Sequence, residues 1–252
     1  MSLHGGNDPA PHQGNVMTGK IALVTGGNKG IGFEVSRQLA QAGFTVLLAA
    51  REVGKARAAA TKLSQEKLDV RPVELDVTKA EQRAAIATYI EKEFGHLDVL
   101  INNAGINLEP ARSGPEMFRE VYETNVIAPN ELTQVLLPLL KKSPAGRIVN
   151  QSSVIGSLTV ISSDEQAAAW AGPAYASSKA ALNMLTVLQA TRLKGTNVKI
   201  NSAHPGWVKT DLGGDGAPMD VATGAKTAVR LAQLPADGPS GKFFHLNDAL
   251  PW

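Results

Sequence analysis

Short apolar runs alternate with helical patterns along most of this 252-residue chain. The runs are continuously apolar, which is typical of strands buried on both faces of a parallel sheet. Strand and helix in alternation favour βα units. We therefore predict an α/β fold with one doubly wound, mainly parallel sheet of about seven strands and helices on both faces. The expected strands are 21–25, 45–50, 70–75, 99–101, 147–151, 198–203 and 243–245, and the expected helices are 30–41, 53–66, 79–94, 115–140, 174–193 and 221–234.

The first 18 residues differ from the rest of the chain. Met1 to Thr18 combine Gly, Pro, Asn and His without a periodic pattern. This predicts a disordered extension or an added leader, with Met17 as an alternative natural start. No Pro/Ser-rich linker and no internal repeat divides the remainder, so we expect residues 19–252 to form one domain.

The composition excludes several classes of function. Its 25 basic and 23 acidic residues leave a formal charge of +2, without the basic run that indicates nucleic acid or an anionic membrane as partner. The chain has no cysteine, and its five histidines lack paired metal-ligand spacing. Its apolar stretches are too short to span a bilayer. We therefore expect a soluble, cytoplasmic protein without a catalytic metal.

A glycine-rich loop, residues 25–32, follows the first expected strand and opens the first expected helix. Its glycines let the backbone approach a pyrophosphate, and the helix N-terminus offers free N–H groups and the positive end of its dipole. Glycine also occurs in ordinary turns, but this position and spacing favour dinucleotide binding. The residues expected to contact the dinucleotide are Gly26, Asn28, Lys29, Gly30 and Ile31.

The end of the second expected strand predicts which dinucleotide is bound. An acidic residue there would bind the 2′-hydroxyl of NAD, whereas arginine accommodates the 2′-phosphate of NADP. This chain has Arg51, with Lys29 in the glycine loop and Lys55 one helical turn further on. The acidic Glu52 argues against NADP binding, and Arg51 alone is also compatible with an ordinary surface arginine. The three cations together favour NADPH.

Two further segments lie where strands end. Asp76, followed by Val77, is placed to accept a hydrogen bond from an adenine amino group. The small residues Asn103, Ala104 and Gly105 follow the fourth expected strand and allow the backbone to approach the cofactor ribose closely. Both segments therefore belong to the expected cofactor site.

Tyr175 and Lys179 are one helical turn apart at the start of a helical pattern. Residues i and i+4 share a helix face, so the ammonium lies beneath the phenol. A free tyrosine has a pKa near 10, and lowering it by roughly three units takes about 4 kcal/mol of preference for the phenolate. A nearby buried cation supplies such a preference. The alternative is a helix with one exposed lysine and one half-buried tyrosine.

These motifs together resemble the classical short-chain dehydrogenase/reductase family. The glycine loop, the Asn102-Asn103-Ala104-Gly105 segment and the Tyr175/Lys179 pair occur in the expected order, and the resemblance covers the chain from about residue 20 onward. Arg51 and the 205–211 segment look most like the carbonyl reductase branch. The resemblance implies a Rossmann-type domain.

The resemblance also implies catalytic roles. Tyr175 would be the general acid that protonates a carbonyl oxygen, and Lys179 would lower its pKa and bind the nicotinamide ribose. Ser153 would hold the substrate oxygen and help to stabilise the developing alkoxide. Asn125 matches the asparagine that anchors a water linked to Lys179. Taken singly, Ser153 and Asn125 are also compatible with a turn residue and a helix-capping amide.

The 205–210 segment resembles the loop that receives the nicotinamide. The resemblance implies cofactor contacts from Pro205, Gly206, Val208 and Thr210. His204 directly precedes this loop. With Tyr175 available as the acid, we interpret His204 as a residue that packs the loop.

The spacing between Ser153 and Tyr175 is longer than in many members of the family, so residues 157–172 form an enlarged segment. In the carbonyl reductase branch a larger insertion here goes with monomers, which leaves the choice between monomer and homo-oligomer open. Ile155, Trp170 and Trp207 are candidates to wall the substrate pocket. The alternative is that these side chains only pack the loops down.

The leading hypothesis is an NADPH-dependent oxidoreductase that reduces a small-molecule ketone, aldehyde or quinone, with Tyr175 as general acid. One alternative is an alcohol, steroid or sugar dehydrogenase or a 3-oxoacyl reductase of the same family. A non-catalytic NADP(H)-binding sensor is an alternative of another class. Such a sensor would be expected to lack Tyr175, Lys179 or Ser153, and this chain has all three.

Overall fold

Eight strands form one sheet in the computed structural model, which describes residues 19–252. The extension expected at residues 1–18 lies outside the described residues. The order across the sheet is β3-β2-β1-β4-β5-β6-β7-β8. The strands are β1 (Ile21–Val24), β2 (Thr45–Ala50), β3 (Val70–Glu74), β4 (Val99–Asn102), β5 (Arg147–Gln151), β6 (Lys199–His204), β7 (Phe243–His245) and β8 (Asp248–Leu250).

The sheet is parallel from β1 to β7, and β8 pairs antiparallel with β7. The strand order reverses between β1 and β4, so the topological switch point, where α/β sheets of this kind bind ligands, lies at the carboxyl ends of these strands. The expected doubly wound parallel sheet is confirmed, and β8 is an addition to it. This last strand is short and largely exposed, so no buried apolar run marks it in the sequence.

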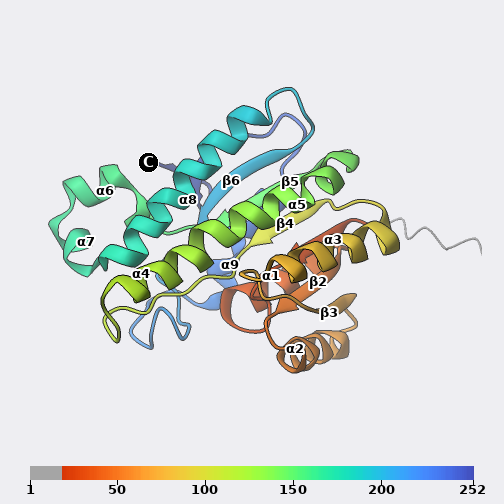
Figure 1. Cartoon of the computed structure of the whole chain (residues 1–252), viewed down its shortest axis with the longest axis horizontal. Helices are drawn as coiled ribbons and strands as arrows, with labels where there is room; N and C mark the ends of the chain where they lie inside the picture. Colours follow the sequence, from red (N-terminus) through yellow and green to blue (C-terminus); the bar gives the residue numbers. More distant parts are fainter. Residues whose placement is uncertain (1–18) are drawn as a thin grey trace, which may run out of the picture.

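Helices cover both faces of the sheet (Figure 1). In β1, Ala22 and Val24 pack in a core with α1, α2 and α9, whereas Ile21 and Leu23 pack in the opposite core with α3, α5 and α8. No helix within residues 19–252 is long and apolar enough to cross a membrane. The helices are α1 (Gly30–Gln41), α2 (Val53–Gln65), α3 (Ala80–Phe94), α4 (Pro115–Tyr122), α5 (Ala128–Lys142), α6 (Leu158–Ser163), α7 (Glu165–Trp170), α8 (Pro173–Arg192) and α9 (Val221–Ala232).

The single helix expected over residues 115–140 is interrupted, which corrects that expectation. A π-helical turn at Glu123–Ile127 joins α4 to α5. Within this turn Asn125 is 1% exposed, so a polar side chain points into the protein. Such π-turns arise inside helices and are frequent at functional sites. The helical pattern continues through the turn, and for this reason the sequence predicted an unbroken helix.

The enlarged segment between β5 and α8 contains two short helices, α6 and α7, which project beyond the start of α8 (Figure 1). Ser157 caps α6 by accepting from the N–H of Val160, and Asp164 caps α7 by accepting two backbone N–H groups. The Thr159 N–H donates to the carbonyl oxygen of Trp252 at 2.9 Å. This contact joins the enlarged segment to the chain that follows β8.

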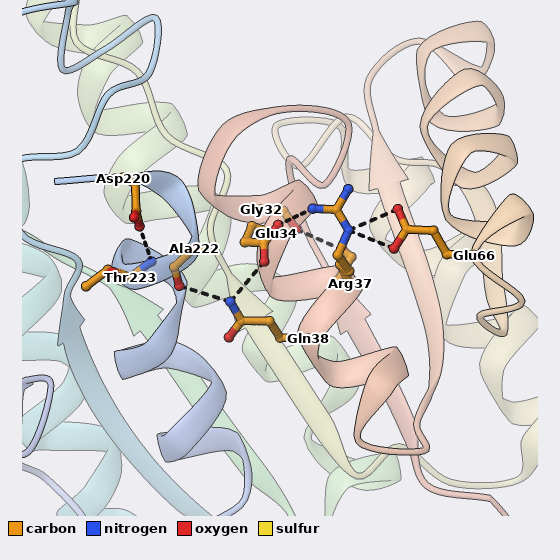
Figure 2. A network of polar contacts seen from close by, with 9 residues as sticks. Gly32, Glu34, Arg37, Gln38, Glu66, Asp220, Ala222 and Thr223 are labelled. Atoms are coloured by element: carbon orange, nitrogen blue, oxygen red, sulfur yellow. Dashed lines mark hydrogen bonds and ion pairs between the residues drawn. The ribbon is translucent and has the colours of Figure 1, made fainter.

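Polar contacts join α1 to α2 and α9 on the side of the sheet opposite α8 (Figure 2). Arg37 of α1 pairs with Glu34 one turn earlier and donates to both carboxylate oxygens of Glu66, at 3.0 and 3.1 Å. Gln38 donates to the carbonyl oxygen of Ala222 in α9 at 2.9 Å. These contacts hold α1, the helix that begins at the glycine-rich loop, against both of its neighbours.

Arg147 is the largest fully buried side chain among the described residues, at 2% exposure. Its guanidinium donates to the carbonyl oxygens of Leu234, Pro235, Gly146 and Asn197. Burial lowers the pKa of Arg147. One side chain therefore joins β5 to the loop after α9 and to the residues before β6.

We expect Arg147→Met to lower the free energy of unfolding by roughly 3 kcal/mol, because several buried carbonyl groups lose their donors at once. Denaturant unfolding followed by circular dichroism measures the change. Arg57→Met, at an exposed position of α2, is the matched control and should alter stability by less than about 0.5 kcal/mol. Equal midpoints for the two variants would contradict a structural role for Arg147.

Candidate active site

The glycine-rich loop lies against the carboxyl end of β4. Asn103 Nδ2 donates to the carbonyl oxygens of Thr25 and Gly26, at 2.9 and 3.2 Å. Gly26 has a φ of +63°, and a Cβ added to it would lie 3.1 Å from Ala104 Cα. Glycine satisfies both conditions without strain. Two segments expected to bind the cofactor are thus brought together at the switch point of the sheet.

The loop also faces residues 205–211. Gly30 has a φ of +55°, and a Cβ added to it would lie 3.4 Å from Thr210 Cγ2. Lys29 forms an exposed ion pair with Asp211 at 2.5 Å. A third expected cofactor segment therefore lies beside the first.

Helix α1 begins directly at this loop without a side-chain cap. Its N-cap residue is Lys29, whose side chain makes no capping hydrogen bond. Asn28 and Ile31 are half-buried on either side of this start. The first N–H groups of a helix have no partner within the helix, and together with the helix dipole they suit an anion such as a pyrophosphate.

The three expected 2′-phosphate cations differ in their partners. Lys55 forms an ion pair with Glu52 at 2.5 Å, so the carboxylate that argued against NADPH is paired with a neighbouring lysine. Lys29 is engaged by Asp211. Arg51 is exposed at the end of β2 and makes no ion pair within residues 19–252. Its guanidinium is therefore the one of the three that remains available for a phosphate.

The turn after β3 is built around Asp76. Its Oδ1 accepts from the N–H and the hydroxyl of Thr78, at 3.0 and 2.7 Å, and its own N–H donates to Gln82. Val77 is buried at 5% exposure. Because β3 runs parallel to β2, Asp76 lies at the same edge of the sheet as Arg51.

Tyr175 and Lys179 lie together in α8, and both are buried, at 9% and 5% exposure. Lys179 Nζ is 5.4 Å from the centroid of the Tyr175 ring and donates to the carbonyl oxygen of Gln151 at 2.8 Å. A Cβ added to Gly105 would lie 3.5 Å from the same Nζ. The expected pair is therefore assembled at the edge of the sheet where the cofactor segments meet.

Burial controls the protonation of this pair in the protein itself. It raises the pKa of Tyr175 to about 12, because a phenolate is poorly solvated there. It lowers the pKa of Lys179 to about 8 for the same reason. In the protein groups alone, burial sets the direction of the Tyr175 pKa, and the lowering of this pKa by Lys179 stays a prediction.

Asn125 connects the π-helical turn to two other parts of the site. Its Oδ1 accepts from the N–H of Ile106 and its Nδ2 donates to the carbonyl oxygen of the same residue, both at 2.9 Å. Nδ2 also donates to Ser178 Oγ at 3.1 Å, and that hydroxyl donates to the Tyr175 carbonyl oxygen at 2.7 Å. Asn125 therefore joins the chain after β4 to the first turns of α8.

Ser153 precedes the 3-10 turn Val154–Gly156, which lies directly against α8. A Cβ added to Gly156 would lie 2.7 Å from Lys179 Cβ, so this close approach requires glycine. The Val154 N–H donates to His204 Nδ1 at 3.2 Å. Burial, and secondarily the charge of His245, lowers the pKa of His204 to about 3, so a neutral imidazole holds the serine turn.

The segment after β6 folds back on itself. Gly206 follows Pro205 with a φ of +89°, and a Cβ added to it would lie 2.7 Å from Met219 Sδ. Val208 is 3% exposed and forms an isolated bridge with Met219. Thr210 Oγ1 donates to the Val208 carbonyl oxygen at 3.3 Å. The loop expected to receive the nicotinamide is thus held by Met219 and by the Thr210 hydroxyl.

The three expected substrate-pocket residues differ in exposure. Ile155 is half-buried in the 3-10 turn, while Trp207 is 55% and Trp170 is 82% exposed. Trp207 Nε1 donates to the carbonyl oxygen of Gly213 at 2.8 Å, which orients its ring. An exposure of 82% means that Trp170 does not pack the loop down, so its indole is accessible to a ligand.

The sequence did not indicate a role for Glu109, which lies near the site. Glu109 accepts hydrogen bonds from the backbone N–H groups of Ala174 and Tyr175, across 65 and 66 residues of sequence. The sequence does indicate that a cap is missing, because α8 begins after Gly172, which has no side chain to cap the helix. No sequence pattern indicates which distant carboxylate takes that place.

Comparison with known proteins agrees with this arrangement. The family model described as short chain dehydrogenase matches residues 20–219. The chain therefore belongs to the short chain dehydrogenase family, and the expected family resemblance is confirmed.

Particular relatives extend the comparison. Short-chain dehydrogenase anuI of Penicillium roqueforti is 37% identical over 86% of this chain and 89% of its own length. The (-)-isopiperitenone reductase of Mentha piperita is 35% identical over 92% of this chain and 98% of its own length. An NADPH-bound carbonyl reductase from chicken fatty liver has a similar structure, with a TM-score of 0.80, 31% identity, and coverage of 94% of this chain and 100% of that one. The similarity thus includes the carbonyl reductase-like branch.

The buried lysine predicts a pH dependence of stability. The folded protein loses the Lys179 proton near pH 8, whereas the unfolded chain holds it up to its ordinary pKa of 10.5. The cost of burying the ammonium, about 3 kcal/mol, is therefore present below pH 8 and is relieved as the pH rises. Relative to Lys179→Met, we expect the free energy of unfolding to increase between pH 8 and pH 10. Parallel pH profiles of the two proteins in denaturant titrations would contradict this.

Proposed function

We propose that this protein is an NADPH-dependent reductase of small-molecule carbonyl compounds, that is, of ketones, aldehydes or quinones. The observation that carries the proposal is the burial of Tyr175 and Lys179 beside Gly105, in the segment after β4 that also contacts the glycine loop. Carbonyl reductases among its relatives support the same reaction class.

The residues present fit a dinucleotide phosphate. Gly26 and Gly30, both at positive φ, leave space beside Ala104 and Thr210 that a side chain would fill. The uncapped start of α1 suits the pyrophosphate, and the available guanidinium of Arg51 suits a 2′-phosphate. When bound, NADPH supplies the hydride that reduces the carbonyl carbon.

The remaining cofactor contacts follow from the position of each residue at the carboxyl edge of the sheet. Lys179 Nζ would bind the ribose hydroxyls while its bond to Gln151 keeps it in place. Asp76 would accept from the adenine amino group through Oδ2, since Oδ1 is engaged by Thr78. The other residues that we assign to cofactor binding are Asn28, Lys29, Ile31, Lys55, Val77, Asn103, Gly105, Pro205, Gly206 and Val208.

Tyr175 is the proton donor in the proposed reaction. The phenol carries its proton at neutral pH and would give it to the carbonyl oxygen, although burial by itself raises its pKa to about 12 and so opposes that transfer. Lys179, with a pKa of about 8, is mostly protonated at pH 7. Its positive charge 5.4 Å from the ring stabilises the phenolate that proton transfer leaves behind.

Ser153 and Asn125 complete the proposed catalytic set. The Ser153 hydroxyl donates to the substrate oxygen as negative charge develops there. Asn125 fixes Ile106 and, through Ser178, the first turn of α8, and would anchor a water linked to Lys179. A sensor without enzymatic activity has no need to retain all four of these residue types.

We expect Tyr175→Phe to lower kcat for carbonyl reduction by about a thousandfold, because the acid is removed while the ring is retained. NADPH oxidation with a panel of quinones, diketones and aldehydes measures the loss. The matched control is Tyr89→Phe in α3, which should keep full activity. Carbonyl reduction by Tyr175→Phe at the native rate would refute the mechanism.

The preference for NADPH depends in this proposal on Arg51. We expect Arg51→Asp to lower the ratio of catalytic efficiencies with NADPH and NADH by roughly a hundredfold, since a charge-assisted hydrogen bond is replaced by repulsion. Steady-state kinetics with both cofactors measure the ratio. Arg57→Asp, in the exposed part of α2, makes the same charge change and should leave the ratio unaltered. An unchanged ratio in Arg51→Asp would refute the assignment.

A further inference from the structure

Helix α8 begins without a cap of its own, although it carries Tyr175 in its first turn. Its N-cap residue is Gly172, followed by Pro173. The first N–H groups of a helix have no partner within it, and an uncapped first turn is prone to fray. The residue proposed as acid therefore lies in the part of α8 that is intrinsically least ordered.

A carboxylate from another part of the chain takes the place of the cap. Glu109 Oε1 accepts from the Ala174 N–H at 3.2 Å, and Oε2 accepts from the Tyr175 N–H at 3.0 Å. Hydrogen bonds from backbone N–H groups to an ionised carboxylate are stronger than neutral ones. The negative charge is also favourable at the positive end of the helix dipole.

The start of α8 is shaped to receive this carboxylate. A Cβ added to Gly172 would lie 2.3 Å from Glu109 Oε2 and 2.6 Å from its Cδ. Gly172 has a φ of −65° and a ψ of 132°, which any residue adopts. A side chain at this position would therefore displace the Glu109 carboxylate, although the backbone conformation itself suits any residue.

Glu109 belongs to the segment that leads away from the expected cofactor site. This segment begins at Ala104 and Gly105, and Asn125 holds both backbone polar groups of Ile106. Three residues further on, Glu109 reaches α8. A short stretch of chain thus connects the residues beside the glycine loop with the backbone of Tyr175.

We propose that Glu109 is a positioning residue for Tyr175, which aligns the phenol by fixing the first turn of α8. The inference rests on the proposed role of Tyr175 as general acid. Glu109 touches backbone N–H groups rather than the reacting atoms. Displacement of a reacting group by about 1 Å can cost roughly a hundredfold in rate, so a loosened first turn lowers kcat more than it lowers cofactor affinity.

Two substitutions, one in each partner of the contact between Glu109 and the start of α8, test this positioning role. Glu109→Gln removes the charge at nearly constant shape, and Gly172→Ala introduces a methyl group where the carboxylate lies. We expect each to lower kcat about tenfold and to change the Kd for NADPH, measured by fluorescence titration, by less than about twofold. Because both act on one contact, the double variant should lose no more than either single variant. Hydrogen exchange at the amides of Ala174 and Tyr175 should become faster in all three.

The matched control is Asp220→Asn. Asp220 caps α9 by accepting from the Thr223 N–H at 2.6 Å, and α9 carries none of the proposed site residues. This variant should keep its kcat even where its melting temperature falls as far as that of Glu109→Gln.

Three results would overturn the role of Glu109. They are a loss of kcat below about twofold in Glu109→Gln, an equal loss in Asp220→Asn, and additive losses in the double variant. Tyr175→Phe separates this inference from the proposed function. If that variant is inactive while Glu109→Gln is fully active, only the positioning role fails, whereas an active Tyr175→Phe refutes the proposed function itself.

Discussion

The Lys179 ammonium is buried, and it donates to the backbone oxygen of Gln151 at the end of β5. A buried charge is costly unless hydrogen bonds offset its desolvation. The side chain therefore has to stay at the carboxyl edge of the sheet, where that carbonyl group points. Because α8 carries both Lys179 and Tyr175, this bond is one of several contacts that hold the helix, and with it the phenol, against the sheet. The pairing of β5 with β4 and β6 keeps the carbonyl oxygen in place in turn.

The helices on the two faces of the sheet hold different parts of the site in place. On one face, α1 is held by α2 and α9 through Arg37 and Gln38, so the start of α1 keeps its position beside the glycine loop (Figure 2). On the other face, α8 approaches the 3-10 turn Val154–Gly156 after β5 so closely that Gly156 is needed at the contact. The glycine loop and the proposed acid thus lie on helices that pack on opposite faces of the sheet. Chemistry that needs two groups at a fixed separation benefits from such rigid elements.

Local patterns in the sequence predicted much of this arrangement. Parallel strands are continuous apolar runs, and the glycine loop and the Tyr175/Lys179 pair each lie within one short stretch, so their neighbours along the chain reveal them. Three features depend on contacts that no local pattern encodes. The carboxylate of Glu109 meets α8 only after folding, the helical pattern does not mark the turn at Glu123–Ile127, and β8 is too exposed to show an apolar run. The pKa of Tyr175 is a fourth case, since its direction follows from how completely the ring is buried.

The π-helical turn has a consequence for helix phase. An α-helix repeats every 3.6 residues, and a turn with i→i+5 bonds takes up one additional residue, so the apolar stripes before and after it are rotated about the common axis. Before the turn, Met117 and Val121 of α4 pack with Ala174 of α8. After it, Ala128 and Leu132 of α5 pack in the core beneath the sheet. The nearly continuous helix formed by α4 and α5 can therefore pack its apolar residues in two different directions, against α8 before the turn and against the sheet after it. The residue at which its phase changes is also the one that turns its amide towards Ile106 and Ser178.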